Sequence, residues 1–259
     1  MSGVEHHYGE RVRISDSPYL ASLLARMGSP EPQLLETIQL LRSAYRVLLA
    51  EALAVWMPTV DQAVETRMAA LHAEHGVWHG RALDPASRVV VVDVIRGGIL
   101  PSQEVFEQLN QVLPGENLRL DHLNMSRRTD SEERVVGVDL SGSKIGGDVT
   151  GATLLMPDPM GATGSTVVEA VRHYEESFGS PAQVLCLPLI ATPEFLRRVL
   201  DEVPGAIVHA GRVDRGLSPA EVLQSTPGEH WEQERGLDDR SYIVPGAGGM
   251  GELLNNSWC

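Results

Sequence analysis

Residues 154–166 read LLMPDPMGATGST, and this stretch decides the fold. Its apolar start suits a buried strand, its middle is small and hydroxylated, and the residues after it, VVEAVRHYEESF, have helical spacing. The pattern predicts a strand, a tight loop and a helix start, where free N–H groups and hydroxyls suit an anion such as phosphate. Asp158 would stand at the carboxyl end of the strand, where open α/β sheets bind ligands. An ordinary helix cap is the alternative, because Ser and Thr commonly precede helices.

Strands and helices alternate on both sides of this stretch. A β-branched run at 88–96, followed by a helical pattern, indicates the start of a βαβ unit. Two further apolar runs and their charged link predict a β-arm at about 118–150. The runs TLLMPD, AQVLCLPLIA and AIVHAGRV then alternate with helical patterns at 164–178 and 193–202. The predicted fold class is α/β, with a doubly wound, mostly parallel sheet.

The two ends of the chain differ from this centre. Apolar residues recur at helical spacing from Ser17 to about His75, which predicts a helical N-terminal region over residues 1–80. Residues 85–215 would form the core. Residues 216–259 would hold a polar excursion at 218–237 and then a C-terminal hood. We interpret residues 1–259 as a single domain.

Composition limits the possible partners. With 35 acidic against 21 basic residues, the formal charge is −14, which argues against nucleic acid and against an anionic membrane surface. The sequence shows no secretion signal and no run of about 18 apolar residues, so we expect a cytoplasmic protein without a membrane span. The two cysteines make no disulfide framework, and Cys186 is interpreted as a core residue. The nine histidines show no spacing typical of metal ligands.

Lysine is almost absent from the chain. Lys144 is the only one, and it lies in the glycine-rich stretch SGSKIGGDVTG. A chain that uses arginine everywhere else could retain this lysine for a ligand. The alternative is a solvated hairpin lysine without a function.

Three motifs together resemble the uracil phosphoribosyltransferase family, which belongs to the type I phosphoribosyltransferases. The stretch VVVVDVIRGGILP at 89–101 is similar to the arginine–glycine loop of that family, and LLMPDPMGATGST is similar to its phosphoribosyl diphosphate motif. The stretch DDRSYIVPGAGG at 238–249 is similar to its base-binding hood. The spacing from Lys144 to Asp158 equals the family's spacing from its hairpin lysine to its motif aspartate. The motifs occur in the family's order over most of the chain.

The resemblance implies transfer of a 5-phosphoribosyl group from phosphoribosyl diphosphate to N1 of uracil, giving UMP and diphosphate, with Mg²⁺ held mainly by the donor. Arg96 would reach the diphosphate and Asp158 the ribose hydroxyls, and these two are the implied catalytic residues. The other implied donor-binding residues are Arg127 (preferred over Arg128), Lys144, Pro159, Met160, Gly161, Ala162, Thr163, Gly164, Ser165 and Thr166. The implied base-binding residues are Ile243, Gly248, Gly249 and Met250. The family pairs through a β-arm, so we expect a homodimer or a higher homo-oligomer.

The sequence departs from the family pattern in three places. Gly249 stands where the family has an aspartate, Gly161 replaces a bulky apolar residue, and the excursion at 218–237 is additional. Glu252, Glu229 or Glu232 could supply the missing carboxylate. If none of them does, Gly249→Asp is expected to raise turnover or to lower the KM for the donor. Two alternatives to a uracil enzyme follow from these departures. The protein could act on another pyrimidine-like heterocycle, or it could be a non-catalytic sensor of the donor or of a nucleotide.

Overall fold

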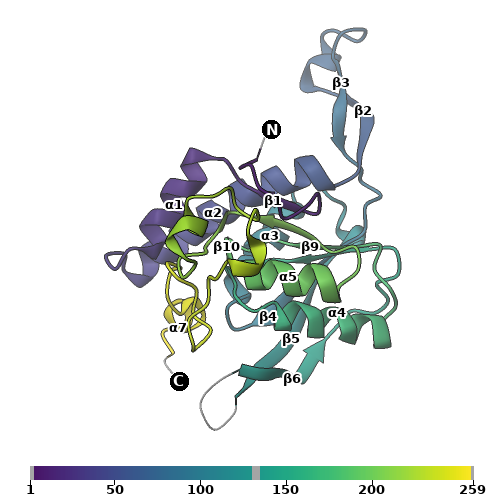
Figure 1. Cartoon of the computed structure of the whole chain (residues 1–259). Coiled ribbons are helices and arrows are strands. Elements are labelled where there is room, and N and C mark those ends of the chain that lie inside the picture. The colour runs from purple at the N-terminus through teal and green to yellow at the C-terminus, as the bar shows by residue number, and fades with distance from the viewer. Residues whose placement is uncertain (1–2, 130–134, 258–259) are drawn as a thin grey trace.

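A seven-stranded sheet forms the centre of the protein (Figure 1). The structure is a computed structural model that describes residues 3–129 and 135–257, with side chains described outside 126–139. In spatial order the strands are β1 (Val12–Ile14), β11 (Ile207–Ala210), β9 (Gln183–Cys186), β7 (Thr153–Met156), β4 (Val89–Ile95), β5 (Leu118–Thr129) and β6 (Val135–Lys144). All neighbours pair in parallel except β5 and β6. The predicted α/β fold with a mostly parallel sheet is therefore confirmed.

Helices cover both faces of this sheet, which explains why its central strands are continuous apolar runs. Val90 and Val92 point into one core, and Val89 and Val91 point into the other. The first core is closed by α4 (Ser165–Ser177) and α5 (Pro193–Glu202). The second is closed by α1 (Pro18–Gly28), α2 (Leu34–Trp56), α3 (Ile99–Leu109) and α7 (Met250–Asn255). Cys186 is buried in the first core, as predicted.

The direction in which the chain builds the sheet reverses between β4 and β7. From β4 the chain crosses through α3 to β5, and then returns to place β7 on the other side of β4. From β7 it continues outward through α4 to β9 and through α5 to β11. Adjacent parallel strands whose connections leave in opposite directions open a crevice at their carboxyl ends, where sheets of this kind bind ligands. The loops that contain Arg96 and Asp158 both begin at this crevice.

Three loops at the carboxyl ends of the strands form a small sheet of their own. Its strands are β8 (Met160–Gly161), β10 (Ile190–Ala191) and β12 (Arg212–Val213), which pair in parallel in the order β12, β10, β8. Each follows a strand of the main sheet by only a few residues. Backbone hydrogen bonds therefore tie together the segments that leave β7, β9 and β11.

The helical region predicted to about His75 ends at Trp56, so the helical prediction beyond that residue was wrong, and a different structure occupies residues 59–83. These residues form a projecting hairpin of β2 (Thr59–Glu65) and β3 (Val77–Leu83), with a single turn of 3-10 helix, η1 (Arg67–Ala70), at its tip. Figure 1 shows this hairpin extending well beyond the rest of the chain. The two strands predicted for the β-arm at about 118–150 are present as β5 and β6, which pair antiparallel at one edge of the main sheet. Most side chains of the projecting hairpin are exposed, so no buried face imposes a readable alternation.

The excursion at 218–237 packs against the N-terminal segment. It contains α6 (Ala220–Leu223) and the short 3-10 helix η3 (Trp231–Gln233). Outside the excursion, a further 3-10 turn, η2 (Gly115–Asn117), precedes β5. The Tyr8 hydroxyl donates to Glu234 Oε2 at 2.6 Å, and the Tyr8 ring meets Trp231 edge-on. Glu234 is almost fully buried and also pairs with Arg215 at 2.6 Å. Among the described residues, no helix combines the length and the apolar character needed to span a bilayer.

Candidate active site

The loop after β7 forms a small cup, made of residues 162–166, at the start of α4. Gly164 precedes the helix with a φ of 77°, a left-handed conformation that favours glycine. The Thr163 and Ser165 hydroxyls are 3.1 Å apart, and Ser165 N–H donates to Thr163 Oγ1 at 3.4 Å. The first N–H groups of α4 have no partner within the helix and carry the positive end of its dipole. The phosphate cup predicted from the sequence thus has a suitable backbone shape.

Neighbouring segments hold the cup in place. Thr192 donates through its hydroxyl to Ala162 O at 2.6 Å and through its N–H to Gly161 O at 3.0 Å. A Cβ on Gly161 would lie 3.2 Å from ring atoms of Phe195 and 3.0 Å from Pro188. Phe195 therefore occupies the space that a bulky residue at 161 would need. The position of Phe195 thus explains why a glycine stands at 161 in this chain.

Asp158 lies two residues beyond β7, as predicted, and one of its oxygens accepts from Met160 N–H at 3.1 Å. It is partly buried at the ends of the strands, between Pro157 and Pro159. Burial, and secondarily the Asp158 charge, raises the pKa of the Tyr45 hydroxyl and raises the pKa of the Cys186 thiol to about 12. Both groups are therefore uncharged at neutral pH.

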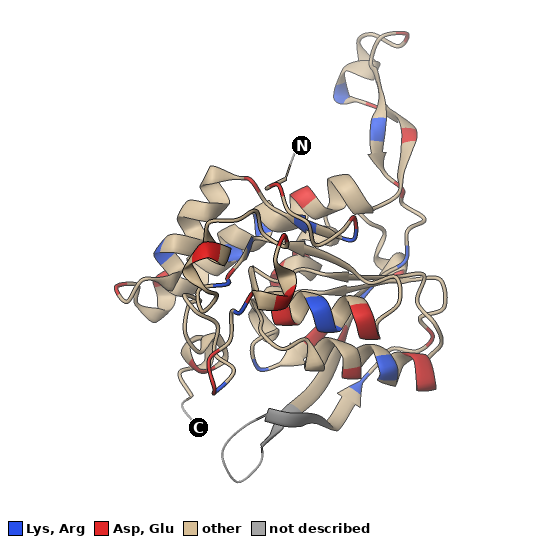
Figure 2. Cartoon of the chain, in the orientation of Figure 1, with Lys and Arg blue, Asp and Glu red and all other residues tan. Residues whose placement is uncertain are grey.

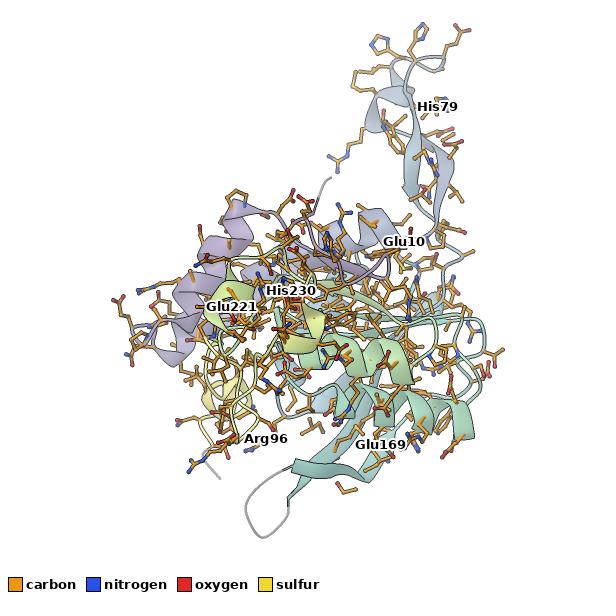
Figure 3. The ribbon with its side chains drawn as sticks, in the orientation of Figure 1. Glu10, His79, Arg96, Glu169, Glu221 and His230 are labelled. Atoms are coloured by element: carbon orange, nitrogen blue, oxygen red, sulfur yellow. The ribbon has the colours of Figure 1, made fainter. Side chains whose placement is uncertain are left out.

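Arg96 follows β4 directly, and its loop lies against the two other motifs. A Cβ on Gly97 would lie 4.0 Å from Cγ of Pro159, and a Cβ on Gly251 would lie 3.7 Å from Gly97 N. The Arg96 guanidinium donates to the Ser257 hydroxyl at 3.0 Å and to the Ser257 carbonyl at 3.3 Å. Figure 3 shows Arg96 beside the C-terminal segment. The loop after β4, the loop after β7 and the start of α7 thus converge.

The hood is anchored by a buried ion pair that the sequence did not reveal. Asp214 is almost fully buried, and it pairs with Arg212 through two contacts of 2.7 and 2.9 Å. Asp214 also accepts from Gly246 N–H at 2.7 Å, while Arg212 donates to Gly246 O at 3.0 Å. Both charged residues thereby fix the hood backbone. Among the predicted base-binding residues, Ile243 and Met250 are buried in the second core, whereas Gly248 is exposed.

Glu252 reaches back to the position where the hood departs from the family. A Cβ on Gly249 would overlap Oε2 of Glu252, so the Glu252 carboxylate fills the space beside the Gly249 backbone. The two other candidates lie elsewhere. Glu229 accepts from Thr226 N–H at 3.3 Å, and Glu232 is highly exposed beside Arg197 at 3.8 Å. Of the three acids considered from the sequence, only Glu252 lies where a side chain at 249 would begin.

Two of the predicted donor-binding residues, Lys144 and Arg127, lie on the outer strands β6 and β5. Lys144 ends β6, and its cross-strand partner is His122, which itself lies opposite Asp93 on β4. Three strand spacings, roughly 14 Å, separate β6 from β7. Arg127 lies on β5 three residues past Asn124, the partner of the last residue of β4, but its side chain is outside the described residues. Their roles toward the donor stay predictions.

A second arginine near the cup was missed in the sequence. Arg198, on α5, donates through Nη1 to the Ser165 hydroxyl, and its Nε lies 3.2 Å from Glu202 Oε1. Figure 2 shows acidic and basic residues interspersed along α4 and α5. In the described part of the chain, no group of three or more His, Cys, Asp or Glu side chains is placed to hold a metal ion.

Comparisons with known proteins match most of the chain. A family model described as uracil phosphoribosyltransferase matches residues 14–229, which include the cup and the Arg96 loop but not the hood. A uracil phosphoribosyltransferase of Nicotiana tabacum is 25% identical over 207 residues, covering 80% of this chain and 76% of the relative. One of Synechocystis sp. is 26% identical over 244 residues, covering 93% of this chain and 95% of the relative. The solved structure of the AQ2163 protein from Aquifex aeolicus shares the fold, with a TM-score of 0.70 at 22% identity over 94% of this chain and 97% of that one.

Proposed function

This chain belongs to the uracil phosphoribosyltransferase family, and from that premise we propose that it transfers a 5-phosphoribosyl group from phosphoribosyl diphosphate to uracil, giving UMP and diphosphate. The observation that carries the proposal is the cup at the start of α4, with Asp158 on its rim, beside the switch point of the sheet. An anion-binding helix start and a ribose-binding carboxylate in one crevice suit a phosphorylated sugar.

The roles of the residues follow from the chemistry of the transfer. Departure of diphosphate leaves a cationic ribosyl centre and builds negative charge on the leaving group. Catalysis therefore needs fixed cations and firm positioning more than a strong base. We assign the 5-phosphate to the cup, the ribose hydroxyls to Asp158 and the diphosphate to Arg96. The backbone of residues 248–250, with Ile243 behind it, would read the edge of the base.

We propose Mg²⁺ as the cofactor, held mainly by oxygens of the donor. Asp158 is the acid that lies on the rim of the cup, and hard oxygen ligands suit Mg²⁺, which usually binds through substrate phosphates and few carboxylates. When bound, the ion would neutralise charge on the diphosphate.

The cytoplasmic location expected from the sequence stays a prediction.

Phosphoribosyl diphosphate with Mg²⁺ is expected to raise the melting temperature of the protein. A ligand selective for the folded state at a hundredfold excess over its Kd stabilises that state by about 2.7 kcal/mol. Thermal unfolding with and without millimolar donor measures this, and the absence of any shift would contradict the assignment of the cup. A screen of nucleobases with donor and Mg²⁺, reading out nucleotide and diphosphate, then identifies the acceptor. Turnover with another heterocycle but not with uracil would favour a transferase for that heterocycle. A lack of turnover with every base tested would favour a non-catalytic sensor.

Glu252→Gln is expected to lower kcat/KM for the donor roughly tenfold, about the contribution of one hydrogen bond to a charged group. We propose that Glu252 supplies the carboxylate that Gly249 lacks, because its Oε2 lies beside the Gly249 backbone. Gly249→Asp alone should then be harmful, since the new side chain would displace Glu252 and repel its charge. The double variant Gly249→Asp with Glu252→Gln should recover activity. Steady-state kinetics on the three variants measures this, and wild-type kinetics of Glu252→Gln would remove the role of Glu252.

We further propose that the protein is a homodimer or higher homo-oligomer, with the projecting hairpin covered by a second copy. A two-stranded hairpin is marginal by itself in water, and this one exposes Val64, Met68, Leu71 and Trp78. Leu71, near the tip, has 76% of its surface accessible. Light scattering at micromolar concentration should give at least a dimeric mass, and Leu71→Asp with Trp78→Asp should lower it. A monomeric mass for the wild type would contradict the proposal.

A further inference from the structure

Arg198 contacts the cup from outside the motif that defines it. It lies on α5, and its Nη1 donates to the hydroxyl of Ser165, the first residue of α4. Its Nε pairs with Glu202 one turn further along α5 at 3.2 Å. Arg198 therefore joins the two helices at the place where the cup opens. A role for this residue toward a ligand rests on the proposed function, because that function places a phosphate in the cup.

The hydroxyl groups of the cup retain one hydrogen for a ligand. The Thr163 and Ser165 hydroxyls are hydrogen-bonded to each other at 3.1 Å, so one of them donates and the other accepts. Arg198 can only donate, so it takes a lone pair of Ser165 and none of its hydrogen. Whichever hydroxyl donates to the other, one hydroxyl hydrogen of the pair is unused by the described residues. A hydroxyl that accepts from a cation is also polarised into a better donor.

The charge around the cup favours a cation close to any phosphate bound there. The motif itself, PDPMGATGST at 157–166, contains an acid and no base. A hollow of about 490 Å³ beside it is lined by Thr163, Arg197, Arg198, Leu237 and three acids, Glu194, Asp201 and Glu202. In a chain of net charge −14, a phosphate dianion there meets repulsion unless a cation is close. Of the two arginines, Arg197 is committed to Trp231, whose carbonyl it contacts at 2.6 Å and over whose ring it lies.

We propose that Arg198 is a positioning residue of the phosphate cup. It supplies positive charge next to a phosphate monoester and holds Ser165 so that a hydroxyl hydrogen of the Thr163–Ser165 pair is directed to a phosphate oxygen. The ligand class is a sugar or nucleoside monophosphate group, as in the 5-phosphate of the donor and of the product. The diphosphate end of the donor is left to Arg96.

The test measures binding of ribose 5-phosphate, which carries the monoester but neither base nor diphosphate. Arg198→Gln should weaken its binding by calorimetry about ten- to a hundredfold, the loss expected for a hydrogen bond that involves a charge. Arg197→Gln is the matched control, since it removes the same charge one residue away on the same helix and should change the affinity less than about threefold. Equal losses in both variants, or none in Arg198→Gln, would overturn the proposal.

A second variant separates positioning from a simple strap between α4 and α5. In a Ser165→Ala background, Arg198→Gln should cost clearly less than in the wild type, because the hydroxyl through which Arg198 acts is gone. Fully additive losses would overturn the role through Ser165. Arg198→Lys, which retains the charge, should recover part of the affinity even if Arg198→Gln proves poorly folded. A strap alone would lower the melting temperature and leave the affinity for ribose 5-phosphate unchanged.

These measurements do not depend on transfer to a base. If no base is converted but ribose 5-phosphate binds with this dependence on Arg198, the proposed function fails and the inference stands. If uracil is converted and Arg198→Gln binds ribose 5-phosphate like the wild type, the inference fails and the function stands.

Discussion

Replacing Arg96 with alanine is expected to lower turnover about 100- to 1000-fold, the loss typical when one charge-stabilising donor is removed from an active site. Arg96 follows β4, next to the place where the order of strands reverses between β4 and β7, and a Cβ built on Gly97 would come within 4.0 Å of Pro159 in the loop of Asp158. This places a fixed cation where diphosphate would depart. UMP has no diphosphate, so its affinity should change less than about threefold. Steady-state kinetics and calorimetry with UMP measure the two effects.

Ser257→Ala is the control for the Arg96 experiment. Arg96 donates to the hydroxyl and the carbonyl of Ser257, so alanine at 257 loosens the arginine without removing it. Turnover close to the wild type is expected for this variant. If Arg96→Ala loses turnover and UMP affinity to the same extent, the guanidinium holds the C-terminal segment in place and does not assist the leaving group.

Acidification from pH 6.5 to about 4 is expected to remove about 3 kcal/mol of folding stability through one side chain, His209. Burial, with a smaller effect from Arg13, lowers the pKa of His209 from 6.5 to about 4. The geometry agrees, because Trp56 Nε1 donates to His209 Nδ1 at 3.1 Å and a proton on that nitrogen would face the indole N–H. The other ring nitrogen lies 3.6 Å from Glu51.

The sign of the effect follows from proton binding. Between about 4 and 6.5 the unfolded chain holds a proton on this imidazole and the folded chain does not, so stability rises with pH in that window. Asp93 acts in the opposite sense, because burial raises its pKa and its contribution is lost as pH rises. Glutamine at 209 retains a hydrogen-bond acceptor for Trp56. Urea unfolding of the wild type and of His209→Gln at several pH values therefore isolates the contribution of His209 to the free energy of unfolding. Parallel pH profiles for the two proteins would show that His209 does not titrate as described.

Much of the fold could be predicted because its centre obeys simple periodicities. The run at 88–96 became β4, buried on both faces, and the pattern at 193–202 became α5 with Thr192 as its cap. Prediction failed where no core imposes a pattern. The helical spacing noted up to His75 had no physical meaning at 59–75, because these residues belong to a hairpin whose side chains are mostly in water. Strand β1, at Val12–Ile14, is too short to show any period, and only its pairing with β11 defines it.

The candidate site was predictable where it lies on a continuous motif. Asp158 and residues 162–166 are placed by one strand, one loop and one helix, all visible in the local sequence. Arg198 and the pair Arg212–Asp214 come from other segments, and only folding brings them to the cup and the hood. A basic residue on an amphipathic helix gives no local signal of its contact. The reach of Glu252 back to Gly249 likewise depends on a turn of α7.

The small parallel sheet of β8, β10 and β12 restricts where this chain can tolerate insertions and deletions. One residue added between β7 and β8 would shift Met160 and Gly161 relative to Ile190 and Ala191. A shift of one residue in a strand turns every side chain to the opposite face, so the cup would be lost. The excursion begins only after β12, beyond the last of these pairings. Engineered insertions should therefore be rejected at 157–161, and within the excursion they should be tolerated at the exposed residues 229–230 better than beside the buried Glu234.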